Sequence, residues 1–130
     1  SDLSIFDRAI RPDDEVIGLV KQLRLRYKTI MISNNSETVV SILKKKHKEM
    51  LKPFDKIYFS YELKMLKPDI RMFRIALEGS GLLPEECIFI DDNAKNIDAA
   101  KAIGMKGLLF NDCNQLKNDL KIEGITISSQ

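Results

Sequence analysis

Two adjacent carboxylates, Asp91 and Asp92, follow a short apolar run and come before a helical pattern. The run at 87–90 has no polar alternation, which is typical of a strand covered on both faces in a parallel sheet. The carboxyl end of such a strand borders the crevice where ligands bind in open parallel sheets. Paired carboxylates there stay ionised together only when a cation or several donors compensate their repulsion. Mg²⁺ meets that need, because it takes one or two protein carboxylates and completes its shell with water and phosphate oxygens.

A second interpretation of the pair needs no ligand. From Asn93 the chain takes helical spacing, with apolar residues at Ile97, Ala100 and Ile103, and Gly104 suits the end of that helix. Asp91 and Asp92 could then do no more than cap the helix. The pair alone does not decide between a metal site and a cap.

Two more stretches place polar groups at expected chain turns. Ser33 and Asn34 end a buried strand expected at 29–33, and Lys67 ends a connector just before Pro68. Taken singly, Ser33 could be a turn residue and Lys67 a surface lysine. Together with the acid pair they match a phosphate site, which needs a hydroxyl, a backbone amide, an ammonium and carboxylates for Mg²⁺.

The elements that would position these groups alternate along the chain. Strands are expected at 29–33, 56–60, 87–90 and 106–110, and helices at 12–25, 37–47, 69–81, 93–104 and 115–121. Strands that alternate with helices predict an α/β fold with a parallel sheet and right-handed crossovers.

Composition limits the partners that we expect. With 130 residues and 44% hydrophobic content the chain can form one domain, and its net charge of +2 gives no reason to expect nucleic acid as a partner. No stretch approaches the roughly 20 apolar residues of a membrane span. Cys87 and Cys113 form no CxxC pair or disulfide framework, which favours a reducing, cytoplasmic location.

Three motifs in a fixed order resemble those of the haloacid dehalogenase (HAD) superfamily. They are Ile-Met-Ile-Ser33-Asn34-Asn35, Lys67-Pro68-Asp69 and Ile-Phe-Ile-Asp91-Asp92-Asn93, similar to the second, third and fourth motifs of that superfamily. The resemblance runs from about 12 to 110 and implies a Rossmann-like core of parallel strands flanked by helices. Response-regulator receivers share this type of sheet, but their acidic pair comes first in the chain and here it comes last.

Within the superfamily, the paired acids are similar to those of magnesium-dependent phosphatases. The segments 60–69 and 91–104 resemble bacterial sugar-phosphate phosphatases and the phosphatase domain of soluble epoxide hydrolases, although Lys64 stands where those relatives usually have Gly. Dehalogenases proper lack the acid pair. The resemblance implies hydrolysis of a small phosphorylated metabolite, a phosphomonoester, through an aspartyl-phosphate intermediate.

The resemblance also implies a role for each matching residue. Ser33 and the Asn34 amide would hold the phosphoryl group, and Lys67 would neutralise the nucleophile and the phosphate oxygens. Ser33 and Lys67 are therefore the candidate catalytic residues of this chain. Asp92 would bind Mg²⁺ directly, with Asp91 beside it in the shell of the metal.

The first motif of the superfamily, Asp-x-Asp after an apolar strand, is the part that the sequence does not match. Asp7 is the only candidate nucleophile, and Ala9 stands where the general acid should be. We therefore interpret 1–11 as the end of a connection from a cap domain, and 12–130 as the C-terminal part of the core. The nucleophile strand and the cap would then be missing from this chain, and the attacking Asp would come from upstream of Ser1.

This interpretation has structural and functional consequences. The missing strand would lie between the strands that end at Ser33 and Asp91, and their exposed edges would pair with an upstream peptide or in a strand-swapped homodimer. The 130-residue chain alone would be inactive. The alternatives are a non-catalytic or truncated binding module, favoured by the absent nucleophile, and an enzyme similar to 2-haloacid dehalogenases.

Overall fold

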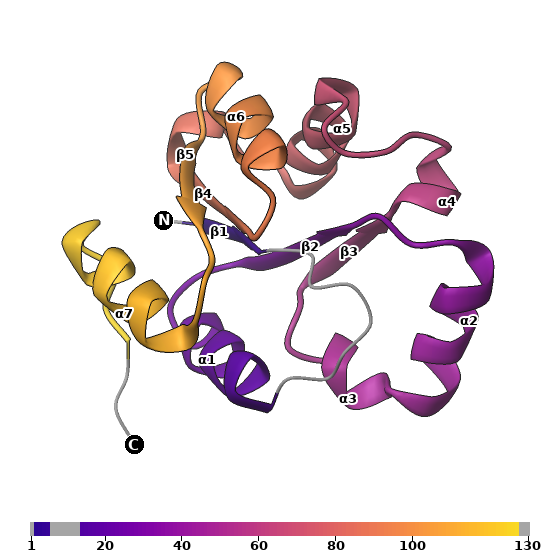
Figure 1. Cartoon of the computed structure of the whole chain (residues 1–130), viewed down its shortest axis with the longest axis horizontal. Coiled ribbons are helices and arrows are strands. Elements are labelled where there is room, and N and C mark those ends of the chain that lie inside the picture. The colour runs from indigo at the N-terminus through magenta and orange to yellow at the C-terminus, as the bar shows by residue number, and fades with distance from the viewer. Residues whose placement is uncertain (1, 6–13, 128–130) are drawn as a thin grey trace.

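The computed structural model describes residues 2–5 and 14–127, and its strands form one parallel sheet (Figure 1). The order across the sheet is β3-β2-β1-β4-β5, and every neighbouring pair is parallel. The strands are β1 (Asp2–Ile5), β2 (Thr29–Ser33), β3 (Lys56–Phe59), β4 (Cys87–Asp91) and β5 (Lys106–Leu109). The predicted α/β fold with a parallel sheet is confirmed.

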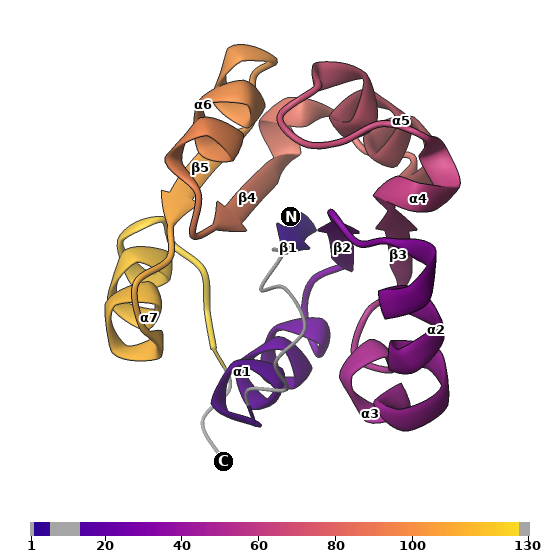
Figure 2. The ribbon, with the colours of Figure 1, turned by 45° about the vertical axis from the view of Figure 1, so that its right-hand side comes forward.

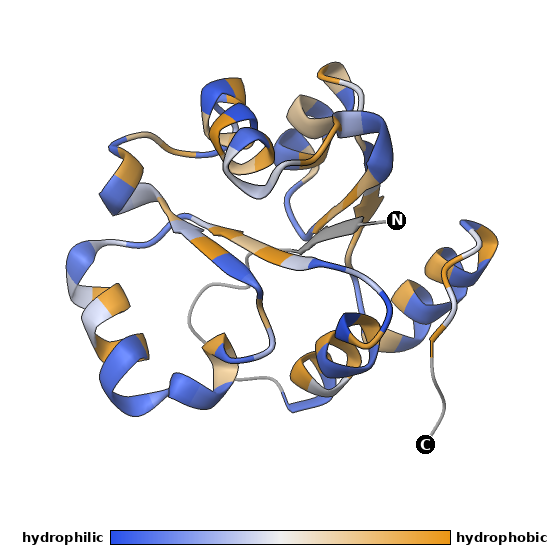
Figure 3. Ribbon diagram, turned by 180° about the vertical axis from the view of Figure 1, so that it is seen from behind, coloured by the Kyte–Doolittle hydropathy of each residue, from blue (hydrophilic) through white to orange (hydrophobic). Residues whose placement is uncertain are grey.

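Helices cover both faces of the sheet. The helices are α1 (Asp14–Arg24), α2 (Glu37–Lys46), α3 (Lys48–Leu51), α4 (Ser60–Leu63), α5 (Ile70–Ser80), α6 (Ala94–Ala102) and α7 (Cys113–Ile122), and a 3₁₀ turn spans Pro84–Glu86. In Figures 1 and 2, α5 and α6 lie on one face, and α1, α2 and α7 lie on the other. The helices show apolar and polar stretches side by side along their turns (Figure 3), as expected when one side of each helix packs on the sheet.

β4 is buried on both sides, which explains its unbroken apolar sequence. Ile88 and Ile90 belong to the cluster formed with α1 and α7, whereas Cys87 and Phe89 belong to the cluster formed with α5 and α6. Phe89 meets Phe73 of α5 edge to face, with ring centroids 4.9 Å apart. A strand with apolar partners on both faces needs no polar alternation.

The centre of the sheet differs from the prediction. We expected no strand of this chain between β2 and β4, but β1 lies there, with Ile5 opposite Met31 on one side and Ile90 on the other. The predicted pair of exposed strand edges therefore does not occur. An open position between two parallel strands would leave two rows of unpaired backbone groups, and β1 supplies their hydrogen-bonding partners.

The segment at 1–11 was expected to be a connection from a cap domain, and part of it forms β1. Asp7, the candidate nucleophile, lies outside the described residues.

No helix in the described part of the chain is long and apolar enough to cross a membrane.

Two short helices were not predicted, and one of them shapes the connector after β3. α4 ends at Lys64, whose backbone is left-handed with φ 58° and ψ 38°. Glycine reaches this conformation without strain, whereas a residue with a Cβ does not. The departure of Lys64 from the family pattern therefore falls on a position whose backbone favours glycine.

Gly107 provides a test of how closely α6 packs on β5. A Cβ at Gly107 would lie 2.7 Å from Cγ2 of Ile97, so Gly107→Ala should lower the free energy of unfolding by about 1–3 kcal/mol. Gly18→Ala is the control, because nothing lies within 4 Å of a Cβ there, in α1. We expect that variant to gain up to about 1 kcal/mol from helix propensity. Urea denaturation measures both, and equal stability of the two variants would contradict this packing.

Candidate functional site

A buried ion pair joins the third and fourth motifs. The Lys67 ammonium donates to Oδ2 of Asp91 at 2.8 Å, and the two side chains are 0% and 1% exposed. Oδ2 also accepts from the Asn96 amide at 3.1 Å, and Oδ1 accepts from the backbone N–H of Asn93 at 2.8 Å. A carboxylate removed from water needs such donors, and here they come from three places in the chain.

The end of β2 holds the backbone of Lys67 in place. Oδ1 of Asn34 accepts from the Lys67 N–H at 2.9 Å, and the Asn34 amide donates to the Lys67 carbonyl at 3.1 Å. The peptide bond between Lys67 and Pro68 is cis. The Lys67 ammonium also lies 5.6 Å from the centroid of the Phe89 ring, within range of a cation–π contact. The second motif thus sets the position of the third.

Ser33 belongs to a second hydrogen-bonded group at this edge. The Asn35 amide donates to Oγ of Ser33, the Asn35 N–H donates to Oγ of Ser60 at 2.9 Å, and the Ser60 hydroxyl donates to the Asn35 carbonyl at 3.2 Å. All three residues are buried. The sequence reasoning missed Asn35 and Ser60 as parts of the site. Ser60 is the last residue of an expected strand, as Ser33 is, and that position could have identified it.

The cap of α6 is provided by Asn93, not by the acid pair. Oδ1 of Asn93 accepts from the Lys95 N–H at 2.9 Å. Asp91 is instead engaged by Lys67, and Asp92 is exposed. For Asp91, the interpretation as a simple helix cap therefore does not describe the side-chain contacts.

The residues at the end of β4 suit magnesium better than a metal that needs a full set of protein ligands. Asp92 is an exposed carboxylate beside the buried Asp91. No group of three or more His, Cys, Asp or Glu side chains in the described part of the chain could hold a metal ion by itself. Mg²⁺ commonly binds through one or two carboxylates and takes water and phosphate oxygens as its other ligands.

The sheet topology places these groups at one edge. From β1 the chain goes to β2 and β3 on one side, and later to β4 and β5 on the other. The order of the strands therefore reverses beside β1, and ligands of open α/β sheets bind outside the carboxyl ends of the strands at such a point. Ser33 ends β2 and Asp91 ends β4, so both lie buried at this edge of the sheet.

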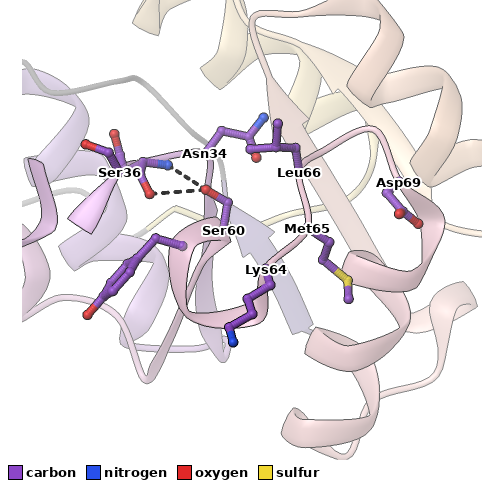
Figure 4. Close-up of a pocket in the computed structure, with 9 residues that line it drawn as sticks. Asn34, Ser36, Ser60, Lys64, Met65, Leu66 and Asp69 are labelled. Atoms are coloured by element: carbon purple, nitrogen blue, oxygen red, sulfur yellow. Dashed lines mark hydrogen bonds between the residues drawn. The ribbon is translucent and has the colours of Figure 1, made fainter. Parts of the chain in front are cut away.

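A cavity of about 690 Å³ lies next to this site, at the carboxyl ends of β2 and β3 (Figure 4). It is lined by Asn34, Asn35, Ser36, Ser60, Tyr61, Lys64, Met65, Leu66 and Asp69.

Asp69 caps α5, as predicted, by accepting from the Arg71 N–H. Hydrogen bonds from the Arg71 guanidinium hold the pKa of Asp69 below its usual range, so this carboxylate is ionised and paired.

The sheet defines a Rossmann-like α/β protein, and one edge of it brings together the Ser33 hydroxyl, the Lys67 ammonium and the adjacent carboxylates of Asp91 and Asp92. The haloacid dehalogenase-like hydrolase family model matches residues 3–104. The chain therefore belongs to the haloacid dehalogenase-like hydrolase family, as the three motifs indicated.

Several relatives of this chain are phosphatases. Sesquiterpene phosphatase astK of Aspergillus oryzae is 32% identical over 104 residues, which are 79% of this chain and 53% of the relative. D-ribitol-5-phosphate phosphatase of Bacteroides thetaiotaomicron is 29% identical over 102 residues, 75% of this chain and 48% of the relative. A HAD family enzyme of the same bacterium, solved with magnesium and inorganic phosphate, has a TM-score of 0.72 and 28% identity, and the match covers 80% of this chain and 57% of that one. The chain spans about half the length of these relatives.

Removing the ammonium of the buried pair tests what holds this site together. Lys67→Met leaves Asp91 buried without a counter-charge, and we expect a loss of about 3–5 kcal/mol in the free energy of unfolding. Lys95→Met, on the exposed side of α6, is the control and should change stability by about 0.5 kcal/mol or less. Chemical denaturation followed by circular dichroism measures both.

A double variant separates the charge from the packing. Lys67→Met combined with Asp91→Asn removes both charges, and the single amide oxygen of the new Asn can still accept from either the Asn93 N–H or the Asn96 amide. It should recover part of the stability that Lys67→Met alone loses. If Lys67→Met were as stable as Lys95→Met, the pair would not hold the site together.

Proposed function

We propose that the full-length protein hydrolyses phosphomonoesters of small metabolites through an aspartyl-phosphate intermediate. The observation that carries the proposal is the buried pair of Lys67 and Asp91, which places an ammonium at the carboxyl edge of the sheet beside Asn34. Membership of the hydrolase family and the phosphatase activity named for two relatives support the same chemistry.

Each residue of the edge has a role in this proposal. Ser33 Oγ and the Asn34 backbone amide would bind oxygens of the transferring phosphoryl group, and the Lys67 ammonium would offset the charge between the phosphate and the attacking carboxylate. Asp91, which accepts hydrogen bonds from Lys67, Asn93 and Asn96, would keep that ammonium in position.

Magnesium is the proposed cofactor. Asp92 would hold it directly, and Asp91 would lie beside it in the shell of the ion. When bound, Mg²⁺ supplies positive charge that stabilises the transferring phosphoryl group. The exposure of Asp92 supports this assignment, because a direct ligand must share the ion with water and substrate.

The attacking Asp is proposed to come from upstream of Ser1. A strand that delivers it between Ser33 and Asp91 would need the position that β1 occupies here, and one strand fits between β2 and β4. The upstream strand and β1 would therefore exclude each other. Because the Asp-x-Asp motif has no match in this chain, we expect the 130-residue chain alone to be inactive. The buried thiols of Cys87 and Cys113 suit a cytoplasmic protein.

A phosphatase assay on the full-length protein with p-nitrophenyl phosphate and Mg²⁺ tests the proposal. Asp92→Ala should lower kcat by about a hundredfold or more, because a metal contributes several kcal/mol to the transition state. Asp98→Ala is the matched control: it is also an exposed Asp, but it lies within α6 and should keep full activity. Removing the metal with EDTA should have the same effect as Asp92→Ala.

The other outcomes have defined meanings. No turnover in the full-length protein would contradict the enzymatic proposal and favour a non-catalytic binding module. Release of halide from a 2-haloacid without any metal would point to a dehalogenase. Equal activity in Asp92→Ala and Asp98→Ala would remove Asp92 from the proposed metal site.

A further inference from the structure

The cavity of about 690 Å³ shares a wall with the proposed phosphate site (Figure 4). Leu66 and Asp69 line it from either side of the Lys67–Pro68 peptide, and Asn34 lines it while its amide group bonds to the Lys67 backbone. It is an open depression at the surface and not an enclosed cavity. A phosphomonoester bound beside Asn34 would therefore place its leaving group next to this depression.

The walls of the cavity suit a leaving group of mixed polarity. Ser60 and Asn35 are buried and bonded to each other, so they form a fixed polar wall. Tyr61, Met65 and Leu66 add apolar surface. Pockets that combine apolar walls with a few placed polar groups select ligands by shape and by polar contacts.

Lys64 lies on the rim in an unusual backbone state. It is the only residue other than glycine with positive φ in the described part of the chain, at 58°. Its N–H donates to the Ser60 carbonyl at 2.8 Å, and the Met65 N–H donates to the same carbonyl at 3.3 Å, so the turn is held on both sides. Strained backbone of this kind is concentrated at functional sites, where it fixes the direction of a side chain.

The two charged residues that line the cavity differ in their partners, and the Lys64 ammonium has no counter-charge among the described residues. Lys64 and Asp69 are the charged residues among those that line it. The Asp69 carboxylate is paired with the Arg71 guanidinium at 2.6 Å. Lys64 is exposed and forms no ion pair with any described residue. The rim therefore offers positive charge to a ligand.

We propose that the cavity receives the leaving group of the substrate and that Lys64 recognises a second anionic group on it. Lys64 is then a specificity-determining residue that favours esters with a carboxylate or a further phosphate on the leaving group. This inference rests on the proposed phosphatase function, because it assigns a cavity to that reaction. A binding measurement that does not depend on turnover therefore tests the anion site separately from the phosphatase activity.

Two esters that differ by one charge test the inference in the full-length protein. Phenyl phosphate and 4-carboxyphenyl phosphate share the phosphate and the ring. Lys64→Gly and Lys64→Met should lower kcat/KM for the carboxylated ester about two- to fivefold, through KM, and leave phenyl phosphate unchanged. The difference should shrink at high salt, because exposed charges are screened. Lys45→Met, an exposed lysine of α2, is the control and should change neither ester.

The two variants separate charge from backbone effects. Lys64→Gly removes the ammonium and relieves the backbone, whereas Lys64→Met removes the ammonium alone. Agreement between them assigns the effect to charge. A loss of equal size for both esters, or no loss in either variant, would overturn the inference.

Binding is measured separately by NMR with a ¹³C-labelled Met65 methyl group, since Met65 lines the cavity. 4-Carboxyphenyl phosphate should shift this signal at lower concentration than phenyl phosphate, and Lys64→Gly should remove the difference. If neither ester is hydrolysed but this preference is present, the proposed function fails while the anion site stands. If the Met65 signal responds to neither ester, the anion site is contradicted whatever the turnover.

Discussion

The structure depends on one buried interaction, the ion pair between Lys67 and Asp91. Burying either charge alone would cost several kcal/mol, and the pair is tolerated because further donors complete the carboxylate. Those donors are the Asn93 N–H and the Asn96 amide, both at the start of α6. The pair thus ties the connector before α5 to the strand–helix turn after β4. It also fixes an ammonium at the edge where Asp92 is exposed, and the proposed phosphoryl transfer would use both groups.

The topology of the sheet makes that pair possible. β2 and β4 flank β1 (Figure 2). The polar residues at their carboxyl ends therefore lie at the same edge of the sheet, on either side of β1. Asn34 completes the connection, because its side chain bonds both the N–H and the carbonyl of Lys67. Three motifs that are distant in the sequence therefore form one hydrogen-bonded unit. The apolar faces of β4, packed against helices on both sides, hold this unit on a rigid base.

The sequence predicted the regular part of this arrangement and missed contacts that depend on side-chain geometry. β4 was predictable because a strand buried on both faces needs an unbroken apolar run. The role of Asn34 in binding the Lys67 backbone was not, because it depends on the path of a connector with a cis peptide bond. The central position of β1 was missed because four residues in an ambiguous segment carry little pattern, and pairing on both sides determines their structure. Lys64 was noticed as a departure from the family, and its left-handed backbone gives that departure a physical meaning.

The proposed function requires Asp92 to bind magnesium, and Ser33 and Lys67 to bind phosphate, at the same edge of the sheet. A crystal structure of the full-length protein with Mn²⁺ in place of Mg²⁺, and with inorganic phosphate, tests it most directly through the anomalous signal of the metal. We expect one metal peak in contact with the Asp92 carboxylate, and a phosphate that contacts Ser33 and the Lys67 ammonium. A metal bound away from Asp92, or a phosphate bound away from this edge, would contradict it.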